Sequence, residues 1–237
     1  MFTKTRTRLL VFYALTVLLG SIVTPPQTWL ANKRNLLNVV FAKFAWGWTT
    51  LVIVAAIAVS SFARPGQQSP PQSGTSTTTL HRLALHTRTT LFWIITTQYF
   101  LGPPLLDRVY MATGSCVAGE DSLVALDAAA LASPKMCKRA GGQWSGFDIS
   151  GHCLLLILAG VSIHEQVRMS KKATKLLREG SAEKRYVDWS IAALRFFQLL
   201  WWIMLVTTAL YFHDIPELYS GTTLAGLYWA AEYAFLL

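Results

Sequence analysis

The sequence predicts an all-α, polytopic membrane protein with six transmembrane helices, and three observations lead to this fold class. Hydrophobic residues make up 53% of the chain and charged residues only 14%, whereas about a quarter of the residues of a soluble domain are charged. The apolar residues form continuous runs, which is typical of helices that face lipid or protein on all sides. Six runs approach the roughly 17–25 residues that a bilayer-crossing helix needs. They cover residues 9–24, 39–62, 89–106, 148–167, 189–212 and 222–237.

These runs predict a single six-span domain over residues 1–237. The first run has a basic start and an apolar centre, and we expect it to be retained as a signal anchor rather than cleaved as a signal peptide. The segment 64–88 begins with a stretch rich in Pro, Gln, Ser and Thr and is expected to be a disordered linker. The segment 107–147 is expected to be a loop.

The charges of the linkers predict the orientation of the chain in the membrane. Basic residues gather in the N-terminus (Lys4, Arg6, Arg8), the second linker (Arg64, Arg82, Arg88) and, most densely, the fourth linker at 168–185. By the positive-inside rule these segments face the cytoplasm. Both termini are then cytoplasmic, and the loop 107–147 is lumenal. The net charge of +9 follows from this topology, so no nucleic-acid partner is expected.

Two of the three cysteines, Cys116 and Cys137, fall in the lumenal loop. An oxidising lumen would allow them to form a disulfide. Two unpaired thiols are the alternative, because sequence spacing alone does not fix the geometry that a disulfide requires.

Ionisable residues at membrane depth are costly and are therefore functional candidates. The predicted spans contain Lys43, His152, Glu165, Arg195 and Glu232, and His213 ends the fifth span. The topology places Lys43, His152 and His213 together at the lumenal face. Arg195 precedes His213 by eighteen residues, about 27 Å along a helix, and is expected to snorkel toward the opposite face.

The sequence indicates no site for the other ionisable groups. Glu165 is expected at the cytoplasmic interface, and Glu232 has no role that the sequence indicates. His81 and His86 are expected to be solvated in a cytoplasmic linker.

The residues around the two lumenal histidines suggest chemistry. A glycine-rich approach leads to His152 at the start of a helix, where free backbone N–H groups favour a phosphate. His213 is followed by two carboxylates. Glu217 would orient the imidazole if the helix continues, and Asp214 if Pro216 ends it. A metal site, a proton relay and a phosphatase remain open. Metal is the weakest, because no further His or Cys lies at ligand spacing, so no metal or cofactor is expected.

Three blocks of residues resemble the fat storage-inducing transmembrane (FIT) family of the endoplasmic reticulum, including its fungal members. The first block contains Asn32, Lys33, Arg34, Asn35, Phe41, Lys43, Trp46 and Trp48. The second contains Trp144, Gly146, Phe147, Asp148, Ile149, Ser150, Gly151 and His152. The third contains Tyr211, Phe212, His213 and Gly221. Together with the six spans, the resemblance covers nearly the whole chain.

FIT proteins are in turn similar to lipid phosphate phosphatases, so the resemblance implies a core of that kind. It implies catalytic roles for His152, His213 and Glu217, and substrate binding by Ser150 and Gly151. The chain departs from the phosphatase pattern at Ile149, Val206 and Thr207, and it has no Lys-x6-Arg-Pro motif. The usual phosphate-binding arginine is therefore missing, and the expected substitutes in the first block are Lys33, Arg34 and Lys43, together with Asn35.

The resemblance implies an enzyme of the endoplasmic reticulum membrane with a lumenal active site. Its substrate would be fatty acyl-CoA, whose diphosphate is cleaved to give acyl-phosphopantetheine and adenosine bisphosphate, and its role would be in lipid droplet formation and lipid balance. One alternative is a non-enzymatic protein that binds diacylglycerol or triacylglycerol, which would not need His152 or His213. A proton-coupled transporter is the other, but it would spread its ionisable groups across the bilayer.

Overall fold

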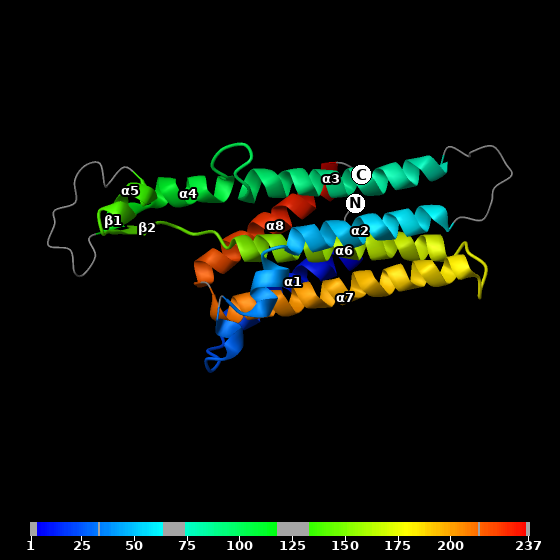
Figure 1. Cartoon of the computed structure of the whole chain (residues 1–237), viewed down its shortest axis with the longest axis horizontal. Helices are drawn as coiled ribbons and strands as arrows, with labels where there is room; N and C mark the ends of the chain where they lie inside the picture. Colours follow the sequence, from blue (N-terminus) through cyan, green and yellow to red (C-terminus); the bar gives the residue numbers. More distant parts are fainter. Residues whose placement is uncertain (1–3, 33, 64–73, 118–132, 213, 236–237) are drawn as a thin grey trace.

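The computed structural model describes residues 4–32, 34–63, 74–117, 133–212 and 214–235. Within these residues the chain forms eight α-helices (Figure 1). In chain order the elements are α1 (Lys4–Ser21), the 3₁₀ turn η1 (Trp29–Ala31), the π-helix η2 (Leu37–Ala42), α2 (Ala45–Phe62), α3 (Gly74–Thr97), α4 (Leu105–Thr113), β1 (Ser115–Val117), α5 (Pro134–Arg139), β2 (Gln143–Ser145), α6 (Gly151–Thr174), α7 (Ala182–Tyr211) and α8 (Ile215–Phe235).

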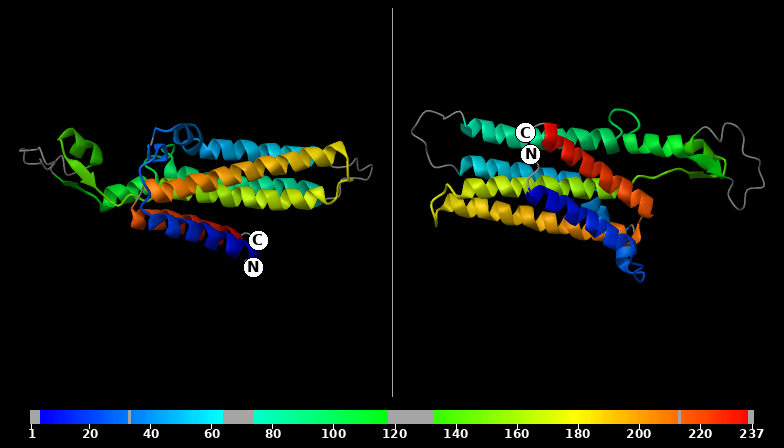
Figure 2. Two further views of the ribbon diagram at one scale, coloured as in Figure 1. Left: turned by 90° about the horizontal axis from the view of Figure 1, so that it is seen from below. Right: turned by 180° about the vertical axis from the view of Figure 1, so that it is seen from behind.

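The fold is that of an α-helical membrane protein. Among the described residues, α2, α6 and α7 are long and apolar enough to cross a bilayer. Helices α1, α3 and α8 pack into the same bundle (Figures 1 and 2). The apolar window of α6 is 78% buried against 33% for α7, so α6 is the central helix and α7 lies on the outside.

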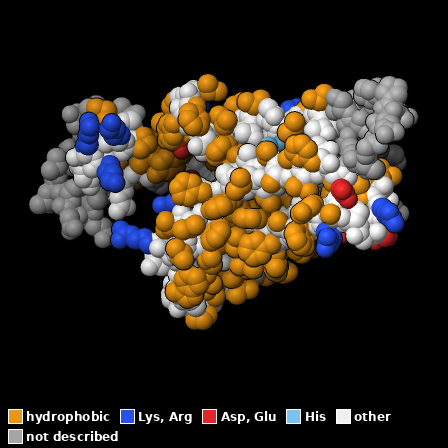
Figure 3. All heavy atoms as spheres, turned by 45° about the vertical axis from the view of Figure 1, so that its right-hand side comes forward, with side chains coloured by type: hydrophobic (Ala, Val, Ile, Leu, Met, Phe, Trp, Pro, Cys, Tyr) orange, Lys and Arg blue, Asp and Glu red, His pale blue; other side chains and the backbone are white. Residues whose placement is uncertain are grey.

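The outside of the bundle is apolar. Large hydrophobic side chains are exposed on several helices, among them Leu15 on α1, Leu51 on α2, Leu91 on α3, Phe196 on α7 and Leu227 on α8. Figure 3 shows a broad hydrophobic face, with most Lys and Arg side chains at the two ends. A contiguous apolar surface of this extent indicates contact with lipid.

Two of the expected spans differ from the helices observed. The run 39–62 is interrupted, since η2 ends at Ala42 and α2 starts at Ala45. The run 89–106 is displaced toward the N-terminus, because α3 ends at Thr97 and two prolines precede α4. Proline lacks the N–H that would continue the helix. Residues 74–88, expected to be disordered, form the first half of α3; residues 64–73 lie outside the described part.

Around the described parts of the segment 107–147, α4, β1, α5 and β2 form a small unit, here called the end subdomain. The two strands pair antiparallel, with Cys116 opposite Trp144. The expected disulfide between Cys116 and Cys137 is confirmed, with 5.6 Å between the Cα atoms, and it joins β1 to α5. Tyr110 of α4 donates its hydroxyl to the Trp144 carbonyl oxygen at 3.0 Å, and the Trp144 indole donates to the Tyr110 carbonyl at 3.2 Å.

A buried ion cluster joins α1 to α6. Glu165 has only 1% of its surface exposed. Its carboxylate accepts from the Arg6 guanidinium at 3.0 and 3.2 Å and lies 2.7 Å from that of Arg168. Pairing across helices thus lets the carboxylate be buried, and its depth at the cytoplasmic interface stays a prediction.

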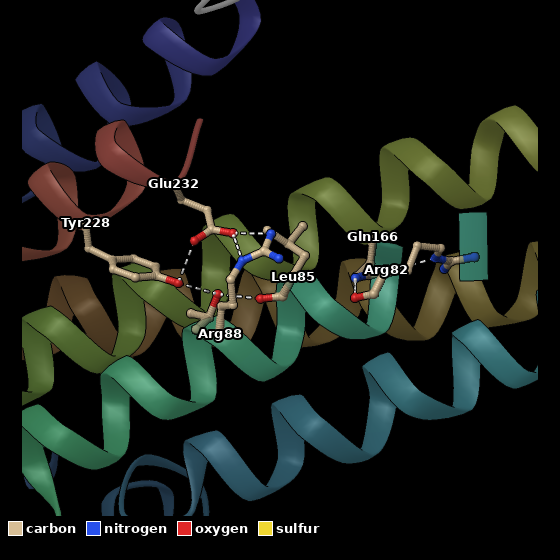
Figure 4. Close-up of polar contacts among 7 residues, drawn as sticks. Arg82, Leu85, Arg88, Gln166, Tyr228 and Glu232 are labelled. Atoms are coloured by element: carbon tan, nitrogen blue, oxygen red, sulfur yellow. Dashed lines mark hydrogen bonds and ion pairs between the residues drawn. The ribbon is translucent and has the colours of Figure 1, made fainter. Parts of the chain in front are cut away.

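Arg82 lies inside the bundle and Arg88, with 34% of its side chain exposed, reaches into it from the edge, although the sequence indicated a solvated linker (Figure 4). Arg82 is 3% exposed and donates to Gln166 at 2.8 Å and Ser170 at 2.9 Å, both on α6. Arg88 forms an ion pair of 2.6 Å with Glu232 of α8. Glu232 thus has an ion-pair partner, and the pair links α8 to α3.

His86 is likewise buried rather than solvated, with 7% of its surface exposed. Its Nε2 lies 3.1 Å from the Thr50 hydroxyl, and its ring stacks on Trp46 with centroids 5.7 Å apart. The histidine therefore packs between α2 and α3.

Candidate active site

The start of α6 is held in place by its own capping residue and by α8. Ser150 caps the helix, and its hydroxyl accepts from the Cys153 N–H at 3.3 Å. The Ser150 N–H donates to the Glu217 carbonyl oxygen at 3.1 Å. A Cβ at Gly221 would collide with the Ser150 carbonyl, so this glycine allows α8 to approach. Gly151 and His152 therefore occupy a fixed position in the first turn of α6.

A cavity of about 330 Å³ opens beside this turn. Its walls come from the η2–α2 junction, the end of α3, α4 and the start of α6. Lys43 and His152 both line it, so the expected convergence of these two residues is confirmed. The cavity brings a cation, an imidazole and the N-terminal turn of a helix together, which is a suitable set of groups for binding a phosphate.

Lys43 owes its position to an unusual backbone. Its N–H donates to the Asn38 carbonyl at 3.0 Å, the hydrogen bond of a π-helix. Such wide turns are frequent at functional sites. Phe44, with φ −107° and ψ 19°, then ends the π-helix before α2 begins. The exposed Lys43 side chain is thereby separated from the regular helix and lines the cavity.

Two carboxylates also line the cavity. The sequence did not single out Asp107, and it placed Asp148 in the second block without an expected role. Partial burial raises the pKa of the Asp107 carboxyl above its usual value. The sequence signal that could have identified both residues was their position at the ends of expected spans. The described residues contain no group of three or more His, Cys, Asp or Glu side chains arranged to hold a metal ion.

The remaining residues of the first block lie elsewhere. The Asn35 amide donates to the carbonyls of Leu30 and Asn32, and its oxygen accepts from the Asn38 N–H at 2.7 Å. Asn35 thus shapes the loop before η2. Arg34 is exposed, and neither residue is among those described that line the cavity. Substrate contacts by Arg34 and Asn35 stay predictions. Lys33 lies outside the described residues.

The second histidine follows the end of α7. That helix ends at Tyr211 and α8 begins at Ile215, so no single helix runs from His213 to Glu217. Pro216 sits at the second position of α8, where a proline is tolerated. The Glu217 carbonyl reaches Ser150, which brings the first turn of α8 to the site. His213 itself lies outside the described residues, and its partner stays a prediction.

Arg195 is separate from this site. It is exposed on α7 and donates to Gln198 at 2.8 Å. It lines a different cavity, together with Tyr13 and Trp202. About 24 Å of helix separates it from Tyr211 at the end of α7, so Arg195 provides a natural control for the cations at the site.

Comparisons with known proteins agree with these features. The family model described as fat storage-inducing transmembrane protein matches residues 26–233. "Acyl-coenzyme A diphosphatase FITM2" of Xenopus laevis is 33% identical over 91% of this chain and 75% of its own length; the mouse (Mus musculus) protein of that name is 32% identical over 92% and 78%.

A fungal relative is similar as well. "Acyl-coenzyme A diphosphatase fit1" of Schizosaccharomyces pombe is 31% identical, over 94% of this chain and 82% of its own length. No solved structure matches the chain. The match to the family model over most of the sequence, together with these relatives, shows that the chain belongs to the fat storage-inducing transmembrane (FIT) family.

Proposed function

We propose that this chain is an acyl-CoA diphosphatase of the endoplasmic reticulum membrane. It cleaves the diphosphate of fatty acyl-CoA to give acyl-phosphopantetheine and adenosine bisphosphate. The observation that carries the proposal is the cavity that Lys43 and His152 share at the start of α6, at one end of an apolar helix bundle. The names of the relatives, acyl-coenzyme A diphosphatases, support the same activity.

In the proposed reaction the His213 imidazole attacks one phosphorus atom and forms a nitrogen–phosphorus bond. The bond from that phosphorus to the bridging oxygen breaks, and His152 gives its proton to the departing oxygen. Water then hydrolyses the phosphohistidine while His152 takes up the water's proton. The carboxylate that holds the His213 ring in the attacking tautomer is proposed to be Glu217, as in the phosphatases that the sequence resembles, or Asp214, because α8 begins only at Ile215.

Phosphoryl transfer depends mainly on positioning and charge stabilisation. Lys43 supplies positive charge for the diphosphate, and the N-terminal turn of α6, with Ser150 and Gly151, supplies backbone dipoles. Lys33 and Arg34 are proposed to contribute from the preceding loop, and Asn35 is proposed to act by holding the shape of that loop. The bilayer can meanwhile hold the acyl chain, because the exposed surface beside the site is hydrophobic.

Six spans are proposed, with α1, α3 and α8 crossing the bilayer beside α2, α6 and α7. The bundle supports this proposal, since all six helices pack together and the cavity lies at the end where α6 begins. Both termini are then cytoplasmic, and the end subdomain and active site are lumenal.

The topology predicts a pattern of glycosylation. An acceptor sequence inserted beside Val117, in the end subdomain, should be modified because it enters the lumen. One inserted near Gln72, between α2 and α3, should remain unmodified. The measurement is the mobility shift of each variant in microsomes, with and without glycosidase. The opposite pattern would reverse the orientation and place the active site in the cytoplasm.

Lipid droplet formation and lipid balance of the endoplasmic reticulum are proposed as the processes this activity supports. A largely apolar groove of about 570 Å³ is lined by Val39, Phe44, Trp48 and Leu51, and it is suited to membrane lipids such as diacylglycerol or triacylglycerol. Lipid binding without cleavage is the alternative function; it would use this groove and would not require His152.

Lys43 provides a test of the site. Lys43→Ala should lower kcat/KM for acyl-CoA about a hundredfold, the scale of losing one group that stabilises developing charge. Arg195→Ala should stay near wild type, because that cation lines a different cavity. The measurement is steady-state kinetics with both purified variants. Loss of activity in Arg195→Ala with full activity in Lys43→Ala would show that the phosphate is bound elsewhere.

A further inference from the structure

A second cavity adjoins the first and is not used by the proposed chemistry. Its volume is about 410 Å³, within the range of small-ligand sites. Asp107 and Asp148 line both cavities, so the two are adjacent. The second extends from the start of α6 into the end subdomain, where Tyr99, Tyr110 and Lys135 contribute to its walls.

The substrate of the proposed reaction needs such a neighbouring space. Fatty acyl-CoA carries an adenosine on the far side of the diphosphate, and its ribose bears a 3′-phosphate. A diphosphate bound between Lys43 and His152 must place this nucleotide beyond the first cavity. The acyl chain leaves in the other direction, toward lipid. The second cavity is the adjoining space on the side away from the bundle.

The second cavity is lined by aromatic side chains of the kind that bind the base of a nucleotide. Two aromatic rings are present, and aromatic side chains are the usual stacking surfaces for bases. The Tyr110 ring is held by the hydrogen bond from its hydroxyl to Trp144, whereas Tyr99 is 67% exposed and open to a ligand.

In the described part of the chain, the charged groups that line the cavity are one lysine, on α5, and the two carboxylates Asp107 and Asp148. Lys135 lines it, and the ion pairs found among the described residues do not involve this lysine. Lys138 and Arg139 lie on the same helix but are not among the described residues that line this cavity. The disulfide from Cys137 to Cys116 fixes α5 against β1, so the charge has a defined position.

We propose that the second cavity is the subsite for the adenosine 3′,5′-bisphosphate part of the substrate, with Tyr99 and Tyr110 stacking on the adenine and Lys135 pairing with the 3′-phosphate. This proposal rests on the acyl-CoA diphosphatase activity proposed above. It makes the end subdomain a substrate-recognition unit that distinguishes CoA esters from other phosphorylated lipids.

The test compares a fatty acyl-CoA with its 3′-dephospho analogue as substrates of the full-length protein. Lys135→Ala should raise KM for acyl-CoA about tenfold, the scale of one charged hydrogen bond. It should leave KM for the dephospho analogue and both kcat values unchanged. Lys138→Ala is the matched control, since this exposed lysine of α5 is not among the residues described along the cavity. Tyr99→Ala should raise KM for both substrates, and Tyr99→Phe should restore it.

The outcomes separate the two proposals. If Lys135→Ala affects both substrates equally or neither, the 3′-phosphate assignment is overturned while the activity stands. If the wild-type protein cleaves neither substrate, the proposed activity fails. The subsite is then decided by titration calorimetry with adenosine 3′,5′-bisphosphate: weaker binding to Lys135→Ala than to Lys138→Ala supports it, and equal binding or none refutes it.

Discussion

Replacing His152 with alanine should lower kcat for acyl-CoA cleavage about a hundredfold or more, the usual contribution of a general acid–base group. The reason is its position: His152 lies in the first turn of α6 and lines the cavity beside Lys43. Without its proton the departing phosphate oxygen must leave as an anion. The measurement is single-turnover and steady-state kinetics of the purified variant.

His164→Ala is the matched control for this variant. It removes an imidazole from the same helix, twelve residues further on and about 18 Å away, and should retain wild-type kcat. Acid-quench trapping with labelled substrate adds a second readout. A phosphoenzyme is expected in His152→Ala but not in His213→Ala, because His213 is the proposed nucleophile. The reverse pattern would exchange the two roles, and full activity in both variants would favour the lipid-binding alternative.

Glu165→Ala should destabilise the protein by about 3–5 kcal/mol, the cost of removing one partner from a buried ion pair. Arg6, with its side chain 8% exposed, and Arg168 both pair with this carboxylate. Its removal leaves the Arg6 guanidinium buried without its ion-pair partner Glu165. Because Arg6 belongs to α1, we expect this helix to lose its contact with α6 first. The measurement is denaturant unfolding in detergent micelles.

A second ion pair provides the comparison for this prediction. Glu179 is 89% exposed and pairs with Lys184 at 2.6 Å, so Glu179→Ala should cost less than about 1 kcal/mol. The loss of stability in Arg6→Met should fall between the losses in these two variants, since Glu165 keeps its ion pair with Arg168. Equal stability of Glu165→Ala and Glu179→Ala would show that the buried cluster does not hold α1 in place.

The sequence predicted the convergence of Lys43 and His152 because both lie about one turn inside the same end of their spans, and depth follows from helix geometry alone. It also located the disulfide, although not its geometry. It failed for α3, where Thr, His and Arg side chains suggested a solvated linker. Arg82 is buried there because Gln166 and Ser170, more than eighty residues away, satisfy it, and local composition contains no information about such partners.

The second cavity could not be predicted from the sequence for a similar reason. Asp107 and Asp148 meet only because the chain breaks after α3 and α4 leads into the end subdomain. Asn35 shows the opposite case, since it belongs to a block that resembles the family, yet its side chain is engaged by the backbone of its own loop. A matching motif identifies positions that matter, and packing determines whether a residue contacts the cavity or supports the loop beside it.

The central claim is that this chain cleaves the diphosphate of fatty acyl-CoA, and identifying the products tests it most directly. The purified protein would be incubated in lipid nanodiscs with a fatty acyl-CoA, and the products quantified by mass spectrometry. Acyl-phosphopantetheine and adenosine bisphosphate are expected in equal amounts, formed as acyl-CoA disappears. Release of free fatty acid with intact CoA, or recovery of uncleaved acyl-CoA, would contradict the account.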